Sequence, residues 1–317
     1  MAAFLVKIVS ATIIICLTFG MDQNEYQYEP PKNSKCRLFS IADDHKEKLV
    51  KEVSEGVRPR NPKIKAPQGM RWSPIWGMSD EFSMRSKSQW LNRGKWDDIS
   101  YNWRGRKPGY FKRSNVQIRK GELILRARSD KPLPSDNQYN SYSTAFVRTK
   151  NTTTYGYFEI MCRPMSSSIS SVFWLQTNSR LDREVEGFRY SASVGRGPSR
   201  TIRFLKWKDI FSTDAISYEG RHKQQKRRPM MYDADFDLSQ QNIIVGLNWQ
   251  KDNIEWYLNG ILMRRIKNDR FHKPQHLQLS TETMESLFGR PRRPRSKEYM
   301  KEFRVMYVRS WELKPAK

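Results

Sequence analysis

The sequence has few of the side chains that form disulfides or bind metals. It contains 3 cysteines and 4 histidines in 317 residues. Cys16 falls in the apolar N-terminal segment, which leaves Cys36 and Cys162 for one internal disulfide or for none. The histidines are scattered without the spacing of zinc ligands, and no nucleophile-elbow motif marks a serine hydrolase. Zinc and serine-hydrolase chemistry therefore find no support in the sequence.

Long apolar runs are also scarce. The one at residues 8–17 directly follows Lys7 and is shorter than the roughly 20 residues that cross a bilayer. A positive start and a short apolar core are typical of a secretory signal. We therefore expect a signal peptide at residues 1–20 and a secreted, extracellular mature chain without a membrane span. A membrane anchor is the alternative. Residues 21–67 are polar, basic and proline-bearing, which predicts an extension and linker.

Acidic residues are outnumbered by basic ones. The chain has 33 Asp+Glu against 58 Lys+Arg, a formal net charge of +25. A field of this sign attracts polyanions such as nucleic acid, anionic lipid or sulfated glycan. Because a secretory signal makes nucleic acid an unexpected partner, the charge favours an anionic or sulfated polysaccharide. The alternative is that the basicity serves solubility alone.

Long amphipathic helical patterns are absent from residues 68–317. Aromatic residues are dense there. Residues 121–128 alternate apolar and polar side chains, and further short strand-like runs such as 156–163 follow between turns. The pair Asn259 and Gly260 marks a hairpin. Many short strands separated by turns predict an all-β sandwich, with residues 68–317 forming one domain.

Several segments, taken in order, resemble a known enzyme family. Residues 76–82 read WGMSDEF, residues 103–111 read WRGRKPGYF, and residues 155–163 read YGYFEIMCR before SSVFWLQ at 170–176. They resemble glycoside hydrolase family 16, and within it the agarase-, porphyranase- and carrageenase-like branch. The resemblance implies a jelly-roll β-sandwich of the concanavalin A-like or glucanase type. It also implies a concave glycan cleft and a polysaccharide of the β-galactan type.

Flat aromatic rings offer rigid contact area to the apolar faces of sugars. The candidate substrate-binding residues are Trp103, Arg104, Arg106, Tyr110, Trp174 and Trp207. Trp174 alternates with Phe173, so it could face either the ligand or the core. The basic residues could equally be ordinary surface cations. Other tryptophans are interpreted as core residues: Trp96, Trp249, Trp256 and Trp311.

The catalytic strand departs from the family pattern, which is Glu-apolar-Asp-x-x-Glu in this branch. With a bulge, Glu184 takes the nucleophile position, Glu186 the auxiliary carboxylate position, and Arg189 replaces the acid/base. Without a bulge, Asp182 joins the two glutamates and three carboxylates remain. We favour the bulged register because Val185 then fills the apolar position. Retaining hydrolysis needs two carboxyl groups about 5–5.5 Å apart.

An arginine cannot serve as the general acid, because its pKa exceeds about 12. The loss of general acid catalysis typically costs about 10²–10⁴-fold in rate. The motif is therefore interpreted as degenerate, with O-glycosyl hydrolysis impaired or lost, and whether the chain is an enzyme stays open. Arg189 would instead suit a sulfate or carboxylate, which a guanidinium binds with two parallel hydrogen bonds.

Two other functions stay open. One is an active retaining endo-glycosidase on a sulfated galactan or β-glucan. The other is a basic matrix or defence protein that binds acidic partners through its basic loops at residues 221–228 and 290–297. No cofactor is expected. Family members often bind a structural calcium ion at the sandwich edge, and the resemblance places Glu81 in that neighbourhood.

Overall fold

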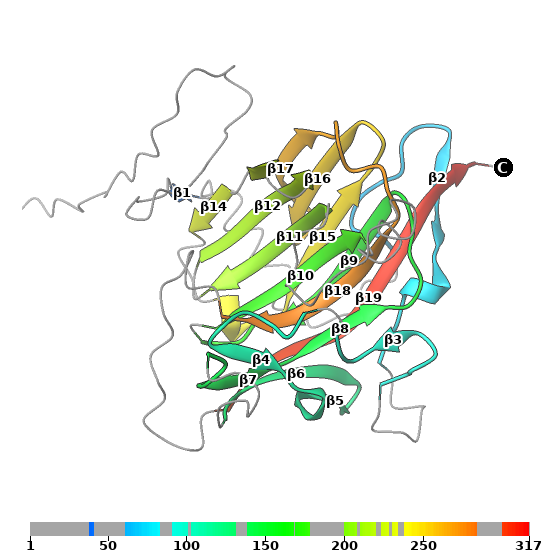
Figure 1. Cartoon of the computed structure of the whole chain (residues 1–317). Helices are drawn as coiled ribbons and strands as arrows, with labels where there is room; N and C mark the ends of the chain where they lie inside the picture. The colour runs from blue at the N-terminus through cyan, green and yellow to red at the C-terminus, as the bar shows by residue number, and fades with distance from the viewer. Residues whose placement is uncertain are drawn as a thin grey trace, which may run out of the picture.

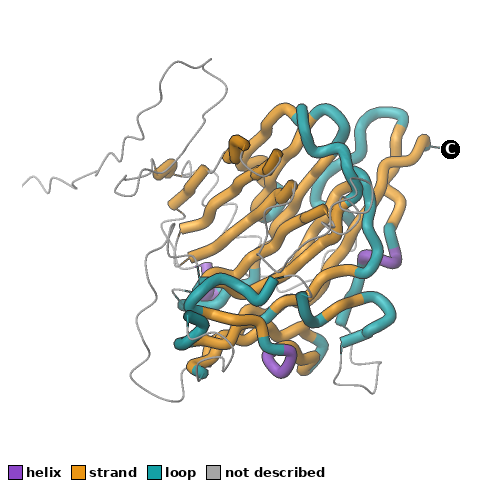
Figure 2. The backbone as a smooth tube through the Cα atoms, viewed as in Figure 1, coloured by secondary structure: helices purple, strands orange, loops and turns teal. Residues whose placement is uncertain are grey.

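A computed structural model describes most of the domain and little of what precedes it. The described residues are 38–40, 61–82, 91–100, 103–130, 138–167, 169–177, 200–207, 210–219, 223–227, 230–233, 238–283 and 300–316. Within 38–40 and 200–233 only the backbone is described. Figure 2 shows this backbone as mostly strand, with short helical turns and connecting loops. The helical turns are η1 (Trp76–Met78), η2 (Arg113–Asn115) and η3 (Leu238–Gln240).

Two β-sheets lie one over the other (Figure 1). Sheet A runs in the order β1 (Leu38–Ser40), β14 (Met230–Asp233), β12 (Ile210–Glu219), β11 (Arg200–Trp207), β10 (Ser170–Thr177), β18 (Gln275–Glu282), β8 (Phe146–Thr149) and β3 (Trp96–Asp97), with β13 (Lys223–Arg227) beside β12. Sheet B runs β17 (Ile261–Lys267), β16 (Asn253–Leu258), β15 (Ile243–Trp249), β9 (Gly156–Arg163), β19 (Met300–Pro315), β6 (Glu122–Ser129), β7 (Tyr142–Thr144) and β4 (Gly109–Phe111), with β2 (Met70–Pro74) beside β19 and β5 (Val116–Arg119) beside β6. The expected all-β sandwich is confirmed.

The core lies between the sheets and follows from the alternation of apolar side chains along each strand. In β9, Phe158, Ile160 and Cys162 point into the core, so the residues between them face outward. The large aromatics that fill the core include Trp96 and Trp249, both almost completely buried. Trp256 belongs to the same cluster. These three tryptophans therefore lie where the sequence predicted.

Trp311 is also buried, but on the outer face of sheet B. Its ring stacks on that of Tyr157, with centroids 5.5 Å apart and planes 19° from parallel. Residues 61–67 lie against this face. The backbone N–H of Lys63 donates to Glu159 at 3.1 Å, and the indole N–H of Trp72 donates to the carbonyl of Ile64 at 3.1 Å. The end of the expected linker therefore packs on the sandwich.

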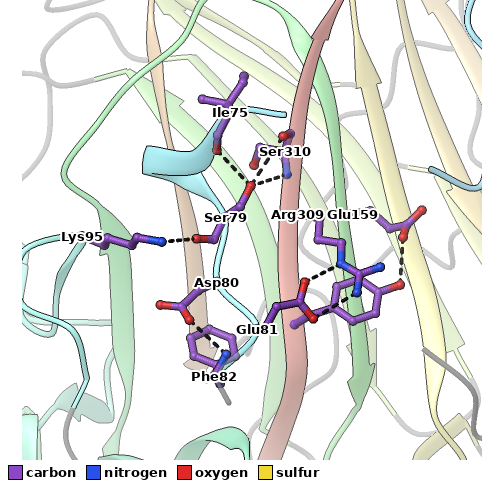
Figure 3. A network of polar contacts seen from close by, with 10 residues as sticks. Ile75, Ser79, Asp80, Glu81, Phe82, Lys95, Glu159, Arg309 and Ser310 are labelled. Atoms are coloured by element: carbon purple, nitrogen blue, oxygen red, sulfur yellow. Dashed lines mark hydrogen bonds and ion pairs between the residues drawn. The ribbon is translucent and has the colours of Figure 1, made fainter. Parts of the chain in front are cut away.

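The segment Ser79–Phe82, which follows β2 and η1, is hydrogen-bonded to β19 (Figure 3). The hydroxyl of Ser79 donates to the carbonyl of Ile75 at 2.9 Å and accepts the backbone N–H of Ser310 at 3.0 Å. Asp80 forms a bridge with β19 and accepts the indole N–H of Trp96 at 3.0 Å. These contacts give the Ser-Asp-Glu-Phe motif a structural role, because they fix the edge of sheet B against the core.

Candidate functional site

An aromatic cluster lies on the outer face of sheet A. The rings of Trp103 and Trp174 meet edge to face, with centroids 5.8 Å apart. Trp103 also contacts Phe111 edge to face at 4.9 Å, and Phe111 lies 5.1 Å from Phe146. Trp174 faces outward because Phe173 on the same strand belongs to the core. The structure thus decides the orientation of Trp174 that the sequence left open.

The loop before β4 holds Trp103 in place. Gly105 has a φ of +114°, and a Cβ there would lie 3.1 Å from the carbonyl oxygen of Gly109, so the turn requires glycine. The turn is closed by the N–H of Gly109, which donates to the carbonyl of Arg106 at 2.8 Å. The N–H of Phe111 donates to the carbonyl of Arg104 at 2.7 Å. Backbone geometry therefore directs this loop over β10 and β18.

A fixed cation stands beside the aromatic cluster. The guanidinium of Arg106 lies 5.5 Å from the ring centroid of Trp103, and its Nε donates to Glu282 at 2.5 Å. Glu282 is buried and also accepts the hydroxyl of Ser280 at 2.6 Å. The contact with Glu282 holds the charge of Arg106 next to the rings. Because the side chain of Arg106 is still 42% exposed, a ligand can reach it.

Three buried polar atoms near this cluster have no hydrogen-bond partner among the described residues. They are Nε1 of Trp174, Oε1 of Gln278 and Nε2 of His276. Trp174 and Gln278 are cross-strand neighbours, and His276 precedes Gln278 on the same face of β18. Buried polar atoms are rarely left without partners. The three atoms lie on the outward-facing side of β10 and β18, the side that carries the aromatic cluster.

His276 is held in a single neutral form. Its Nδ1 lies 2.6 Å from the carbonyl oxygen of Thr149, which can only accept, so Nδ1 carries the proton. Burial, followed by the charge of Arg148, lowers the pKa of His276 below its ordinary value. Nε2 is therefore left as an acceptor at neutral pH.

The structure brings together Trp103, Arg106 and Trp174, and it separates Tyr110 from them. Tyr110 points to the other side of β4, where burial and the carboxylate of Asp130 raise its pKa. Arg104 is exposed. Trp207 lies in β11, where only the backbone is described, and the proposed catalytic residues lie outside the described residues: Glu184, Glu186 and Arg189.

Two residues of the aromatic cluster were not among those predicted from the sequence. Phe111 occupies the place beside Trp103 that was expected for Tyr110, because neighbouring residues of a strand point to opposite faces. Phe146 supports Phe111 from β8. The strand-like run at residues 144–150 was visible in the sequence, but nothing in it said which face would meet the Trp103 loop.

No cluster of three or more metal-ligating side chains occurs in the part of the chain that the structure describes. Glu81, the neighbourhood suggested for calcium, is paired with Arg309, whose Nε and Nη2 donate to the two carboxylate oxygens at 2.6 and 3.0 Å (Figure 3). Cys162 is buried in β9, while Cys36 lies outside the described residues, so both alternatives, one internal disulfide or none, stay open.

Comparison with protein families decides the relationship. The family described as "Beta-porphyranase A-D, GH16 domain" matches residues 72–313. The chain belongs to this family. The resemblance to glycoside hydrolase family 16 is thereby confirmed. The match lies within the domain expected at residues 68–317 and covers both β10 and the loop that carries Trp103.

Two porphyranases of Zobellia galactanivorans are relatives of this family 16 domain. β-Porphyranase B is 24% identical over 226 residues, which are 67% of this chain and 72% of the relative. β-Porphyranase E is 26% identical over 231 residues, which are 68% of this chain and 79% of the relative. The aligned parts therefore exceed two thirds of each protein.

Solved structures support the same fold. Porphyranase B of Zobellia galactanivorans superposes with a TM-score of 0.64 at 19% identity, over 81% of this chain and 99% of that one. The κ-carrageenase of Pseudoalteromonas carrageenovora, in complex with a κ-carrageenan oligotetrasaccharide, superposes with a TM-score of 0.61 at 19% identity, over 81% of this chain and 100% of that one. Such likeness shows the jelly-roll sandwich.

Among the described residues, no helix has the length and apolarity needed to cross a membrane.

Proposed function

We propose that this family 16 protein is secreted and binds a sulfated galactan along the outer face of sheet A, with glycosidic hydrolysis impaired or lost. The observation that carries the proposal is the cluster of Trp103, Trp174 and Arg106 beside buried polar atoms without partners. Relatives named for porphyran and κ-carrageenan suggest the polymer class. The N-terminal signal-like segment suggests secretion.

Each group has a part to play in binding. The exposed side of Trp103 stacks on the apolar face of a sugar ring, a contact that aromatic side chains make at low entropic cost. Arg106 stands where it can donate two hydrogen bonds to a sulfate ester. Nε1 of Trp174 donates to a sugar hydroxyl and Nε2 of His276 accepts from one, which removes the cost of leaving them without partners.

The impairment of hydrolysis rests on the order of residues after β10. In the bulged register Glu184 keeps the nucleophile position, whereas Arg189 stands at the acid/base position. A permanently charged guanidinium cannot give a proton to the leaving oxygen. It can instead add to the positive charge that Arg106 presents to an anionic chain.

The decisive experiment measures the release of reducing ends from porphyran, κ-carrageenan, agarose and laminarin. The purified mature protein is compared with Glu184→Gln and Arg189→Glu. We expect no release by the native protein and a gain of cleavage in Arg189→Glu on the polymer that it binds. Cleavage by the native protein that disappears in Glu184→Gln would instead identify an active retaining enzyme.

Binding is tested separately by affinity electrophoresis in gels that contain each polymer. Trp174→Phe keeps an aromatic ring and removes the indole N–H donor, so the affinity should fall about threefold to tenfold, the value of one hydrogen bond. Trp311→Phe makes the same change on sheet B and serves as the matched control. If neutralising residues 221–228 abolished binding and Trp174→Phe left it unchanged, the protein would bind acidic partners through its basic loops.

A further inference from the structure

A polar hollow lies on sheet B, separate from the aromatic cluster on sheet A. It has a volume of about 490 Å³ and is formed where β5 and β9 end and β19 begins. Four of its lining side chains are cations: Arg119, Arg163, Lys301 and Arg304. Glu302 is the one acidic side chain in this lining. The hollow is therefore strongly basic within an already basic protein.

Glu302 orients the arginines without neutralising them. Its Oε2 accepts Nη2 of Arg119 at 2.5 Å and Nη2 of Arg304 at 3.0 Å, and its Oε1 accepts Nε of Arg126 at 3.3 Å. The carboxylate is only 12% exposed, whereas Arg119 and Arg304 are 42% and 41% exposed. Glu302 thus holds three guanidinium groups in place, and Glu122 lies 4.0 Å from Nη1 of Arg304, so two carboxylates stand beside three arginines. The exposed N–H groups of Arg119 and Arg304 that remain can donate to a ligand.

Arg163 adds a cation that has no acidic partner among the described residues. It stands directly opposite Arg304 in the pairing of β9 with β19, and like charges in this position destabilise a sheet. The Nε of Arg163 donates to the neutral side chain of Asn242 at 3.2 Å. No carboxylate in the described part of the chain forms an ion pair with Arg163 or Lys301. An anion bound between the two arginines would relieve their repulsion.

Arg163 and Arg304, which pair across β9 and β19, face the outer side of sheet B. Cys162 and Phe303, which adjoin Arg163 and Arg304 in sequence, point into the core, so the two arginines point outward. Ser239, a neutral hydroxyl donor, also lines the hollow. Met300 at its margin is 47% exposed and offers an apolar contact. Guanidinium groups, a hydroxyl and an apolar margin together fit an oxyanion carried on a sugar.

We propose that this hollow binds a sulfate ester of a polysaccharide, as a site separate from the aromatic cluster on sheet A. Guanidinium groups match the oxygens of a sulfate and bind them with paired, charge-assisted hydrogen bonds. Because Glu302 already fixes two of the arginines, less side-chain entropy is lost on binding. The choice of a sulfated galactan as the natural polymer rests on the proposed function, but the anion site itself does not.

The test compares variants that remove equal charge from different places. Arg163→Gln/Arg304→Gln alters the hollow, while Arg93→Gln/Arg265→Gln removes two exposed arginines elsewhere, 64% and 59% exposed. Affinity is measured for dextran sulfate and κ-carrageenan, with neutral dextran as the blank. We expect the hollow variant to bind dextran sulfate at least about tenfold more weakly than the control variant, as loss of charge-assisted contacts would produce.

Equal affinities of the two double variants would overturn the proposal, because binding would then follow net charge alone. Thermal unfolding of both variants checks that neither has lost its fold. Trp174→Phe separates this proposal from the proposed function. Because the hollow lies on the other sheet, Arg163→Gln/Arg304→Gln should weaken dextran sulfate binding by the same factor in the Trp174→Phe background as in the native protein. An unchanged affinity of Trp174→Phe alone for κ-carrageenan would count against the proposed function and leave the hollow untouched.

Discussion

Glu159 illustrates how one residue can couple the sandwich to the segment that precedes it. The carboxylate is fully buried on the outer side of β9. Its oxygens accept the hydroxyls of Tyr157 at 2.7 Å and Tyr307 at 2.8 Å, besides the N–H of Lys63. Burial nevertheless outweighs these hydrogen bonds and raises the pKa of Glu159. The folded state therefore prefers the protonated form more than the unfolded state does.

The sign of the pH dependence follows from this raised pKa. Between the ordinary pKa of 4.5 and the raised pKa, the folded protein binds more protons than the unfolded chain. The contribution of Glu159 to the free energy of unfolding is therefore complete below about pH 4.5 and is lost as the pH rises through the folded pKa. Denaturant unfolding at a series of pH values measures this.

We expect the free energy of unfolding of the native protein to fall, relative to Glu159→Gln, as the pH rises from about 4 to about 7. Tyr307→Phe removes a hydrogen bond that favours the ionised carboxylate, so that variant should lose more stability over the same range. A constant difference between Glu159→Gln and the native protein at every pH would contradict this account.

At the scale of elements, β9 depends on the glycine at its start. Gly156 has a φ of +143°, and a Cβ built there would lie 2.6 Å from the carbonyl oxygen of Trp311 in β19. Backbone cannot move away as a flexible side chain would. The close approach of β9 to β19 at this point therefore requires a glycine at position 156.

Gly156→Ala should lower the free energy of unfolding by at least about 3 kcal/mol, combining backbone strain with overpacking. Gly69→Ala is the matched control, since Gly69 also has a positive φ of +74° but nothing within 4 Å of the added Cβ. It should cost about 1–2 kcal/mol. Chemical denaturation compares the two, and equal losses would mean that the contact with Trp311 relaxes without cost.

At the scale of the whole molecule, the two polar surfaces lie on different sheets. The aromatic cluster forms where the Trp103 loop meets β10 of sheet A. The basic hollow is formed by β5, β9 and β19 of sheet B (Figure 1). A single sulfated chain, or two chains, could contact both. The net charge of +25 would draw such a chain toward either surface.

Salt should separate this attraction from the contacts of the aromatic cluster. The screening length falls from about 10 Å at 0.1 M to about 3 Å at 1 M salt. We expect the affinity for κ-carrageenan to drop at least about tenfold over this range, because long-range attraction is then screened. Any affinity for neutral agarose should change little. An equal loss of affinity for both polymers would show that charge does not govern which polymer the protein binds.

The family, the strand pattern and the core tryptophans could be predicted from the sequence. The strand pattern and the order of the motifs are local properties, so the short aromatic and apolar run at residues 156–163 is enough to predict β9. Trp103 and Arg106 stood out for the same reason, since the glycine-rich basic loop that holds them is continuous in the chain. Tyr110 was chosen over Phe111 because adjacency in sequence does not say which face of β4 meets the site.

Only the tertiary structure decided which of these residues meet. Trp174 faces outward because its neighbours fill the space between two sheets, and such packing is not encoded in any one strand. The buried polar atoms of Gln278 and His276 gain meaning only from the pairing of β18 with β10. The basic hollow likewise joins Arg119, Arg163 and Arg304, which lie far apart in the sequence. Sequence determines each side chain and its local conformation, whereas the register between distant strands determines the surfaces they share.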